Sequence, residues 1–346
     1  MHAECDREQI DDAELAKLFE QSFPLKRQPP KNDDRPPPIN PYVVIRYDET
    51  DIGVRPAPGG AVTYLSPDLL VTNLTGAPDI IVGQPHRLQA RLSNFGLFPA
   101  TLVQVDFYWA NPSMAITETS VNFIGSGLLP HLPAGSSSGP SAMVVDCATD
   151  WVPVFENGGH ECLLARATVP TFDAGPVPLD PGLSYRVGQR NLNVVQVAAG
   201  QSFKMFVRAA NFARFPLAAQ VWGGRMDARQ IRQWLAMSRG RSRQAQDFQE
   251  GALSWRITAD EPPEPLPGPT KLFAERLLAY DDDPRESPPK SQRMWAQELP
   301  AMTEQKLTVH AAVPQGARPG AVYSLSLQQQ LGPILTGGYG ILLVVV

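Results

Sequence analysis

The sequence has few cysteines, no long apolar run and no basic excess, and each shortage excludes a class of protein. Three cysteines among 346 residues are too few for a disulfide scaffold. No stretch approaches the roughly 20 apolar residues that a membrane helix requires. The formal net charge of -5 lacks the basic footprint of a nucleic-acid-binding protein. We therefore expect neither a disulfide-rich module, nor a membrane span, nor a nucleic-acid partner.

The first twenty residues also lack the pattern of a secretory signal. Acidic residues occur throughout this stretch, and it has no apolar core after a basic start. Together with the scarcity of cysteine, this predicts a protein that stays in the cytoplasm or leaves the cell by a leaderless route.

Proline and glycine are abundant, with 35 and 27 residues. Proline interrupts helix interiors and central strands, so the chain needs many turns, edges and linkers. This composition disfavours helical bundles and doubly wound α/β folds. With 43% hydrophobic residues, the chain is long and apolar enough for two domains.

Residues 1–60 are predicted to form an N-terminal arm. A short helix over about 11–21 precedes proline-rich stretches that favour an extended course. A helix this short is marginal in water, so we expect it to dock on its own body or on a partner. The apolar residues on one side of this helix are Leu15, Leu18 and Phe19.

From about Tyr64 onward, short apolar runs are separated by Gly, Pro, Asn and Ser. Alternation of apolar and polar residues is clear in 88–92 and 103–107. A side-chain period of two with frequent turns is typical of an antiparallel sandwich. The segment 192–197 is expected to close the first sandwich.

An internal repeat divides this β region into two copies. The same residues recur at one fixed spacing, as Gly83, Gln84, Arg91, Asn94, Phe95, Phe98 and Pro99, and later as Gly200, Gln201, Arg208, Asn211, Phe212, Phe215 and Pro216. In each copy we expect Asn to satisfy turn backbone groups and Phe to plug the open end of a sandwich. The predicted fold is all-β, with tandem immunoglobulin-like antiparallel sandwiches at 61–197 and 198–346.

The second copy carries a predicted, partly helical insertion at about 223–300. Its first helix runs from Asp227 to about Gln249, and a further helix is expected at 270–279. The polar side of the first helix is rich in arginine, which suits either a protein contact or phosphates. Residues of this helix predicted to bind a partner are Arg229, Arg232 and Trp234.

Residues 62–197 resemble the bacterial immunoglobulin-like modules of the CARDB type, with a weaker echo in 198–346. The resemblance is carried by 64–71, the Gly83-Gln84 turn, 91–96, 105–112, 132–135 and 159–166. Such modules usually act as non-catalytic spacers or binding domains, so the resemblance implies a fold more than a function.

Three motifs contain residue types that could form a catalytic or metal-binding site. Residues 135–139 match the Gly-x-Ser-x-Gly of a nucleophile elbow, but no helix is expected after them. His160, Cys147 and Cys162 suit either zinc or thiol chemistry, or simply a packed strand. The acidic run 281–283 lacks the ligand spacing of an EF-hand. We predict no catalytic residue, no cofactor and no metal.

The sequence therefore favours a non-enzymatic structural or protein-interaction protein, acting as a subunit or adaptor of a larger bacterial assembly. Its arm and inserted helix would bind a protein partner or a second copy, and deletion of residues 1–41 would abolish assembly. One alternative is a glycan-binding module that uses exposed aromatic residues such as Trp109 or Trp151. A further alternative is an enzyme with its site in the 223–300 insertion.

Overall fold

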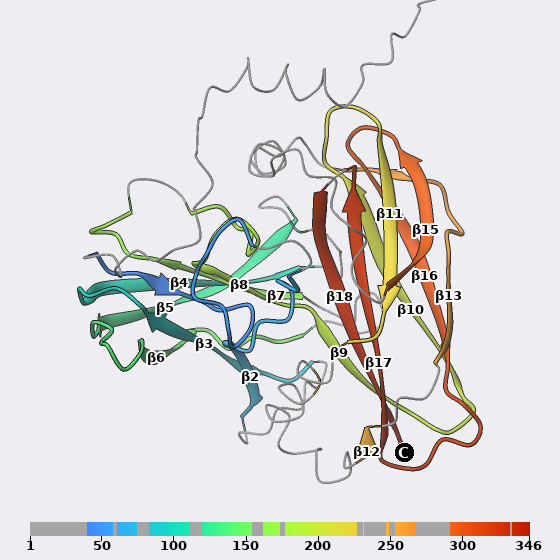
Figure 1. The fold of residues 1–346 in the computed structure, drawn as a ribbon, viewed down its shortest axis with the longest axis horizontal. Coiled ribbons are helices and arrows are strands. Elements are labelled where there is room, and N and C mark those ends of the chain that lie inside the picture. The colour runs from blue at the N-terminus through green and yellow to red at the C-terminus, as the bar shows by residue number, and fades with distance from the viewer. Residues whose placement is uncertain are drawn as a thin grey trace, which may run out of the picture.

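The computed structural model describes residues 40–57, 61–74, 83–110, 116, 120–153, 162–173, 177–226, 231, 247–248, 253–266, 291–332 and 334–346. These residues form four sheets that pack as two β-sandwiches, so the predicted all-β class is confirmed. Figure 1 shows the sandwiches side by side, with the long strands of the second running across the direction of the first. Among the described residues, no helix is long and apolar enough to cross a membrane.

The first sandwich consists of two four-stranded antiparallel sheets. One contains β1 (Val43–Val44), β2 (Leu69–Asn73), β3 (His86–Asn94) and β6 (Ser141–Asp146). The other has the order β5 (Val121–Leu132), β4 (Ala100–Ala110), β7 (Cys162–Thr168) and β8 (Val187–Arg190). Alternate apolar side chains of both sheets, such as Leu88 and Val105, face inward and form a single buried core.

The second sandwich is built in the same way, with added strands. One sheet contains β10 (Ser202–Asn211), β16 (Thr303–Ala312), β13 (Ser254–Thr258) and β14 (Glu264–Pro265). The other has the order β15 (Ser291–Leu299), β11 (Leu217–Gly224), β17 (Ala321–Leu331), β18 (Ile334–Val345) and β9 (Leu192–Val197), with β12 (Asp247–Phe248) beside β17. The pairs β9–β18 and β12–β17 are parallel, and the other pairs are antiparallel.

The internal repeat is confirmed by the topology. β3 pairs with β6 as β10 pairs with β16, and β4 lies between β5 and β7 as β11 lies between β15 and β17. The last pair, β7 and β8, corresponds to β17 and β18. The spaced identities in the sequence therefore mark equivalent positions in two copies of one topology.

Asn94 and Asn211 hold the same turn in the two copies. Asn94 ends β3, and its side-chain amide donates to the carbonyls of Phe98 and Pro133, both at 2.9 Å. Its Oδ1 accepts from the backbone N–H groups of Tyr42 and Gly96. The second copy repeats this pattern, with Asn211 donating to Phe215, Leu299 and Pro300 and accepting from Ala213. The predicted role of Asn in satisfying turn backbone groups is confirmed.

The two repeated phenylalanines differ in burial. Phe212 is buried in a small apolar cluster at one end of the second sandwich, as the plug prediction requires. Phe95 is only half-buried in the first sandwich.

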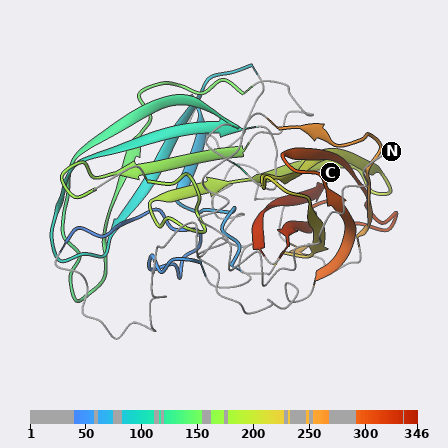
Figure 2. The same cartoon turned by 90° about the horizontal axis from the view of Figure 1, so that it is seen from above.

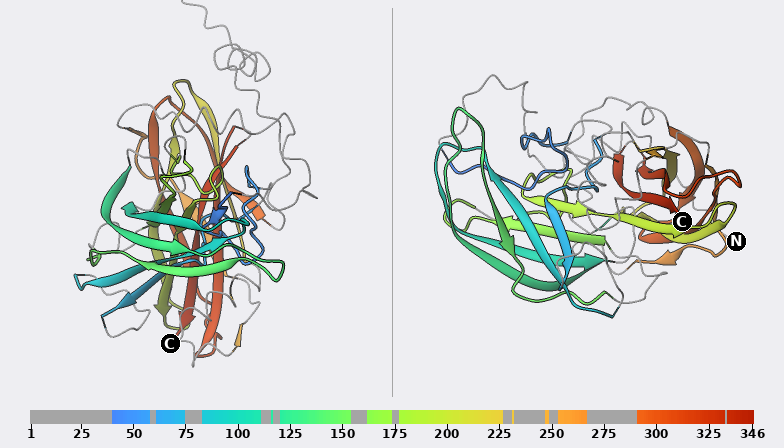
Figure 3. Two further views of the ribbon diagram at one scale, coloured as in Figure 1. Left: turned by 90° about the vertical axis from the view of Figure 1, so that its left-hand side faces the viewer. Right: turned by 90° about the horizontal axis from the view of Figure 1, so that it is seen from below.

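A continuous strand joins the two sandwiches. Only Asn191 separates β8, in the first sandwich, from β9, which pairs with β18. The segment 192–197 is thus a strand, as predicted, but it lies in a sheet of the second sandwich. Tyr64 crosses the same junction, and its hydroxyl lies 2.7 Å from that of Ser326. Figures 2 and 3 show the two sandwiches from other sides.

The predicted insertion contributes strands to the second sandwich. β13 and β14 pair with β16, and β15 takes the place of β5. The helix predicted from Asp227 to about Gln249 is wrong at its end, where Asp247–Phe248 form β12. The physical reason is the length of β11. In the described residues β11 pairs with 326–331 of β17, and β12 pairs with 321–322, which lie beyond the end of β11. Ile231 is helical and buried, and the other residues of this helix lie outside the described residues, as do 11–21 and 270–279.

The two sandwiches close one edge differently. In the first, β5 lies directly against β6. This close approach requires glycine at 127, because a Cβ there would come within 2.1 Å of the carbonyl oxygen of Asp146. In the second, β13 lies at this edge, and the ring of Trp255 takes the space that a Cβ on Gly223 would enter. The second sandwich therefore depends on an added strand where the first does not.

Candidate functional site

The outer surface of β4 and β5 carries the most exposed large apolar side chains of the described residues. Phe123 is 61% exposed and Leu128 is 60% exposed, and both lie on β5. The register sets Phe123 opposite Tyr108 and Leu128 opposite Gln104. The ring centroids of Phe123 and Tyr108 lie 5.7 Å apart in an edge-on arrangement. We call this surface the β4–β5 face.

A polar cluster lies between these two apolar residues. Asp106 accepts hydrogen bonds from Gln104 at 2.8 Å and from the Ser126 hydroxyl at 2.6 Å. Arg166 of β7 lies 3.7 Å from the Asp106 carboxylate and donates to the Tyr108 hydroxyl at 2.5 Å. These polar side chains are thus already ordered by contacts within the face. Less conformational entropy is therefore lost when a partner binds.

The second sandwich provides an internal comparison for this face. Its corresponding strand, β15, exposes mainly polar side chains, namely Gln292, Arg293, Ala296, Gln297 and Glu298. Gln220 faces Ala296 in the register, whereas Gln104 faces Leu128. The fold therefore does not require large apolar residues at these β5 positions.

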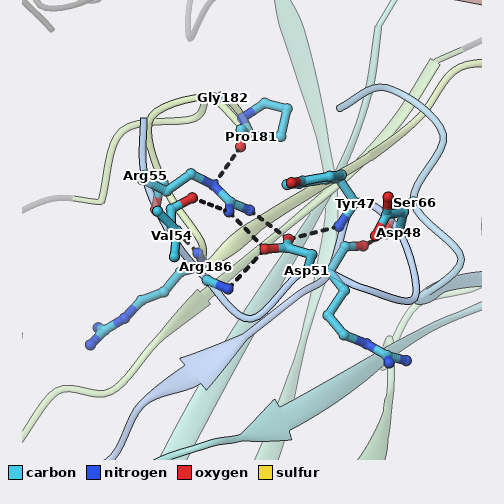
Figure 4. A network of polar contacts seen from close by, with 12 residues as sticks. Tyr47, Asp48, Asp51, Val54, Arg55, Ser66, Pro181, Gly182 and Arg186 are labelled. Atoms are coloured by element: carbon cyan, nitrogen blue, oxygen red, sulfur yellow. Dashed lines mark hydrogen bonds and ion pairs between the residues drawn. The ribbon is translucent and has the colours of Figure 1, made fainter. Parts of the chain in front are cut away.

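A second polar cluster fastens residues 46–57 to the first sandwich (Figure 4). Asp51 and Arg55 form a nearly completely buried ion pair at 2.8 Å. Asp51 also accepts from the backbone N–H groups of Tyr47 and Gly53, and Arg55 donates to the carbonyl of Pro181. A carboxylate with this many donors is held in place and suits a structural role better than proton transfer.

Residues with shifted pKa values lie in such structural contacts. Burial raises the pKa of Tyr64 to about 12 at the junction of the sandwiches. Burial lowers the pKa of Arg190 to about 10 at the end of β8. A hydrogen bond to Asp68 raises the pKa of Arg46, whose guanidinium lies 2.8 Å from that carboxylate. These groups are spread over separate contacts and form no constellation for acid–base catalysis.

The residues predicted to bind a partner lie outside the described residues. These are Leu15, Leu18, Phe19, Arg229, Arg232 and Trp234. The structure therefore does not test them.

The two tryptophans suggested as glycan platforms do not form such platforms. Trp151 is 4% exposed and is part of the first core, against the ring of His86. Trp109 is half-buried and packs against the same core, because it lies on the inward side of β4. This part of the glycan-binding alternative is wrong.

The serine-rich loop 135–139 does not form a nucleophile elbow. Ser136 and Gly139 exchange two backbone hydrogen bonds, so the loop turns back on itself, and β6 follows it. The strand-to-helix geometry that would raise a nucleophilic serine is absent here.

The two described cysteines are not joined in a disulfide and lie in different clusters. Cys162 is fully buried on the outer side of β7, whereas Cys147 packs against the first core. Burial raises the pKa of the Cys147 thiol, which disfavours the reactive thiolate. Within the described ranges, no group of three His, Cys, Asp or Glu residues could hold a metal ion. His160, Cys5 and 281–283 lie outside those ranges.

The β4–β5 face is not evident from the sequence because the alternation of apolar and polar residues in β5 is irregular. A bulge near Ile124 shifts the alternation, and Gly125 and Gly127 replace apolar residues on the inward side. One sequence feature does indicate an exposed apolar surface: Leu128 lies at an outward position of β5, two residues before Pro130.

No family model matches the sequence, and no curated protein matches it. The CARDB resemblance therefore stays a prediction. Among solved structures, the chain shows distant likeness to the collagen adhesin of S. aureus, with 7% identity, a TM-score of 0.21, and coverage of 83% of this chain and 96% of that one. The CupB6 tip adhesin from Pseudomonas aeruginosa matches with 9% identity, a TM-score of 0.20, and coverage of 81% and 99%.

A family 123 glycoside hydrolase from Clostridium perfringens also matches, with 9% identity and a TM-score of 0.24. The match covers 45% of this chain and only 23% of the hydrolase. All these TM-scores are too low for the likenesses to carry an argument about function.

Proposed function

We propose that this chain is a non-enzymatic interaction module that binds another protein through the β4–β5 face. The observation that carries the proposal is the contrast between β5 and β15. In the first copy β5 exposes two large apolar residues, Phe123 and Leu128, whereas β15 of the second copy exposes mainly polar ones. Aromatic and apolar anchors beside ordered polar groups are common in protein interfaces.

Burial of the two exposed side chains would contribute to the free energy of binding. Fully burying a Phe or Leu side chain is worth about 1.5–3 kcal/mol each relative to leaving it exposed. The Asp106–Arg166 cluster between them supplies polar groups whose positions are already fixed. A partner with apolar pockets and matching polar groups would gain both affinity and orientation.

The mode of recognition proposed is side-chain contact across the face rather than strand addition to the edge. The carbonyl of Ser126 already accepts from the N–H of Ala148, which uses one outward group of β5. Pro130 offers no N–H, and the bulge at Ile124 bends the strand.

The wider proposal places the chain as a subunit or adaptor of a bacterial assembly, with immunoglobulin-like sandwiches as rigid spacers. The N-terminal arm with Leu15, Leu18 and Phe19 would add a second contact. The inserted helix with Arg229, Arg232 and Trp234 would add a third. The continuous β8–β9 strand would hold these surfaces at fixed relative positions.

The test is affinity capture from cells that produce the chain, with the native mass of the complex as the readout. The double variant Phe123→Ser, Leu128→Ser should lose the partner, whereas Ala296→Ser, at the matching position of β15, should keep it. Removing residues 1–39 leaves every described residue in place and tests the arm separately. A double variant that binds normally, or one that binds but loses a hydrolytic or transfer activity, would refute the proposal.

A further inference from the structure

One long edge of the second sandwich is uncovered in the described part of the chain. β10 pairs with β16 along all ten residues, from Ser202↔Ala312 to Asn211↔Thr303. The N–H of Val313 donates to the carbonyl of Gln201, so residues 201, 203, 205 and onward direct their backbone groups to β16. The backbone groups of Lys204, Phe206 and Arg208 therefore point the other way, where no described strand pairs with them.

The first sandwich shows what fills this position when it is occupied. β3 corresponds to β10, and its outer edge is covered by β2 along His86–Ala90 and by β1 at Ser93–Asn94. Between these strands, the N–H of Arg91 donates to the carbonyl of Asp68 at 2.8 Å. The same fold thus accepts a strand antiparallel to β3 at the place where no described strand lies beside β10.

A side chain already takes the place of a strand at one end of this edge. Gln329 of β17 is fully buried, and its amide accepts from the N–H of Ala210 at 2.9 Å and donates to its carbonyl at 2.8 Å. Ala210 corresponds to Ser93, which pairs with β1. Gln329 therefore satisfies the backbone that a β1-like strand would pair with, and the open positions are those that correspond to the β2 site.

The chemistry of the flanking side chains selects the occupant. Lys204 is exposed, Phe206 is 38% exposed, and the ammonium of Lys306 lies 4.7 Å from the Phe206 ring centroid. Arg208 is ion-paired with Glu304 of β16. Two-fold pairing with a second copy centred on Phe206 would set Lys204 opposite Arg208, and like charges directly opposite are destabilising. An acidic strand instead meets attraction at Lys204.

We propose that the edge of β10 that no described strand covers binds an extended, acidic, proline-free segment of a partner protein, antiparallel to β10 as β2 is to β3. Backbone hydrogen bonds to Lys204, Phe206 and Arg208 supply affinity, and glutamate or aspartate beside Lys204 supplies specificity. Proline is excluded because the added strand must donate its own N–H groups.

The test uses the full chain and a short, blocked peptide of alternating glutamate and valine. Binding is measured by calorimetry, and backbone amide exchange is measured by NMR. The peptide should slow exchange at Lys204, Phe206 and Arg208, and a peptide with lysine in place of glutamate should bind much more weakly. Lys204→Glu should weaken binding about 10-fold, since an attractive cross-strand pair becomes repulsive.

Arg87→Glu is the matched control, because Arg87 corresponds to Lys204 but its strand edge is occupied by β2, where it faces Thr72. This variant should bind the peptide like the wild type, and so should Phe123→Ser, Leu128→Ser, which separates this site from the β4–β5 face. Equal binding of the acidic and basic peptides, no binding of either, or equal effects of Lys204→Glu and Arg87→Glu would overturn the proposal. Protection of the β10 amides through dimerisation of the chain alone would also overturn it, by making a second copy the occupant.

Discussion

Replacing Asn211 with alanine tests whether the repeated asparagine stabilises the second sandwich. Asn211 is fully buried, and its amide donates to three carbonyls at 2.9–3.0 Å while its Oδ1 accepts from Ala213 at 2.9 Å. Each net hydrogen bond contributes about 1 kcal/mol, and a buried group left without a partner costs about 1–3 kcal/mol. Because two N–H donors are shared among three carbonyls and the site can relax locally, we expect the unfolding free energy to fall by about 3 kcal/mol.

The assay is urea unfolding followed by tryptophan fluorescence and circular dichroism. Asn94→Ala, which removes the equivalent bonds of the first sandwich, should cost a similar amount. Asn122→Ala is the control, because Asn122 is exposed on β5 and should change stability by less than about 0.5 kcal/mol. A loss below about 1 kcal/mol for Asn211→Ala would refute the reasoning that the repeated asparagine stabilises each sandwich through buried hydrogen bonds.

Three further changes probe other parts of the structure. Burial raises the pKa of Tyr64 to about 12 from an ordinary value near 10, so the folded chain keeps a proton that the unfolded chain releases between pH 10 and 12. This contribution to stability is complete below pH 10 and falls by about 2.7 kcal/mol across that window, and the unfolding free energy of Tyr64→Phe should lack that fall. Gly223→Ala should cost about 1–3 kcal/mol because a Cβ there meets the tryptophan of β13, whereas Gly316→Ala, with nothing within 4 Å, should be nearly neutral in thermal unfolding. Arg55→Ala should cost about 3–5 kcal/mol, since it leaves the Asp51 carboxylate buried without its ion pair; a melting temperature like that of the wild type would contradict this.

The sequence was most informative where side chains repeat at fixed spacing. Asn94 and Asn211 predicted two copies of one module, and their bonds show why each copy needs an amide at that position. Alternation likewise predicted β3 and β4, because one face of each strand is buried.

The sequence was less informative where tertiary pairing decides the structure. The strand 192–197 was found, but its apolar character could not show that it pairs with β18 in parallel. The end of the helix predicted over 227–249 failed because 247–248 meet an unoccupied part of β17. Trp109 and Trp151 could not be placed from their side chains alone, since aromatic residues suit cores and binding platforms equally.

The most direct test of the proposed function is side-chain oxidation footprinting of the captured complex. Phe123 and Leu128 are both at least 60% exposed in the chain alone, so they should be oxidised readily when it is free. Our account predicts that both become severalfold less reactive when the partner is bound, while the exposed Phe206 at the β10 edge is unchanged unless that second site is also occupied. Oxidation of Phe123 and Leu128 at the same rate in the free chain and in the complex would contradict it.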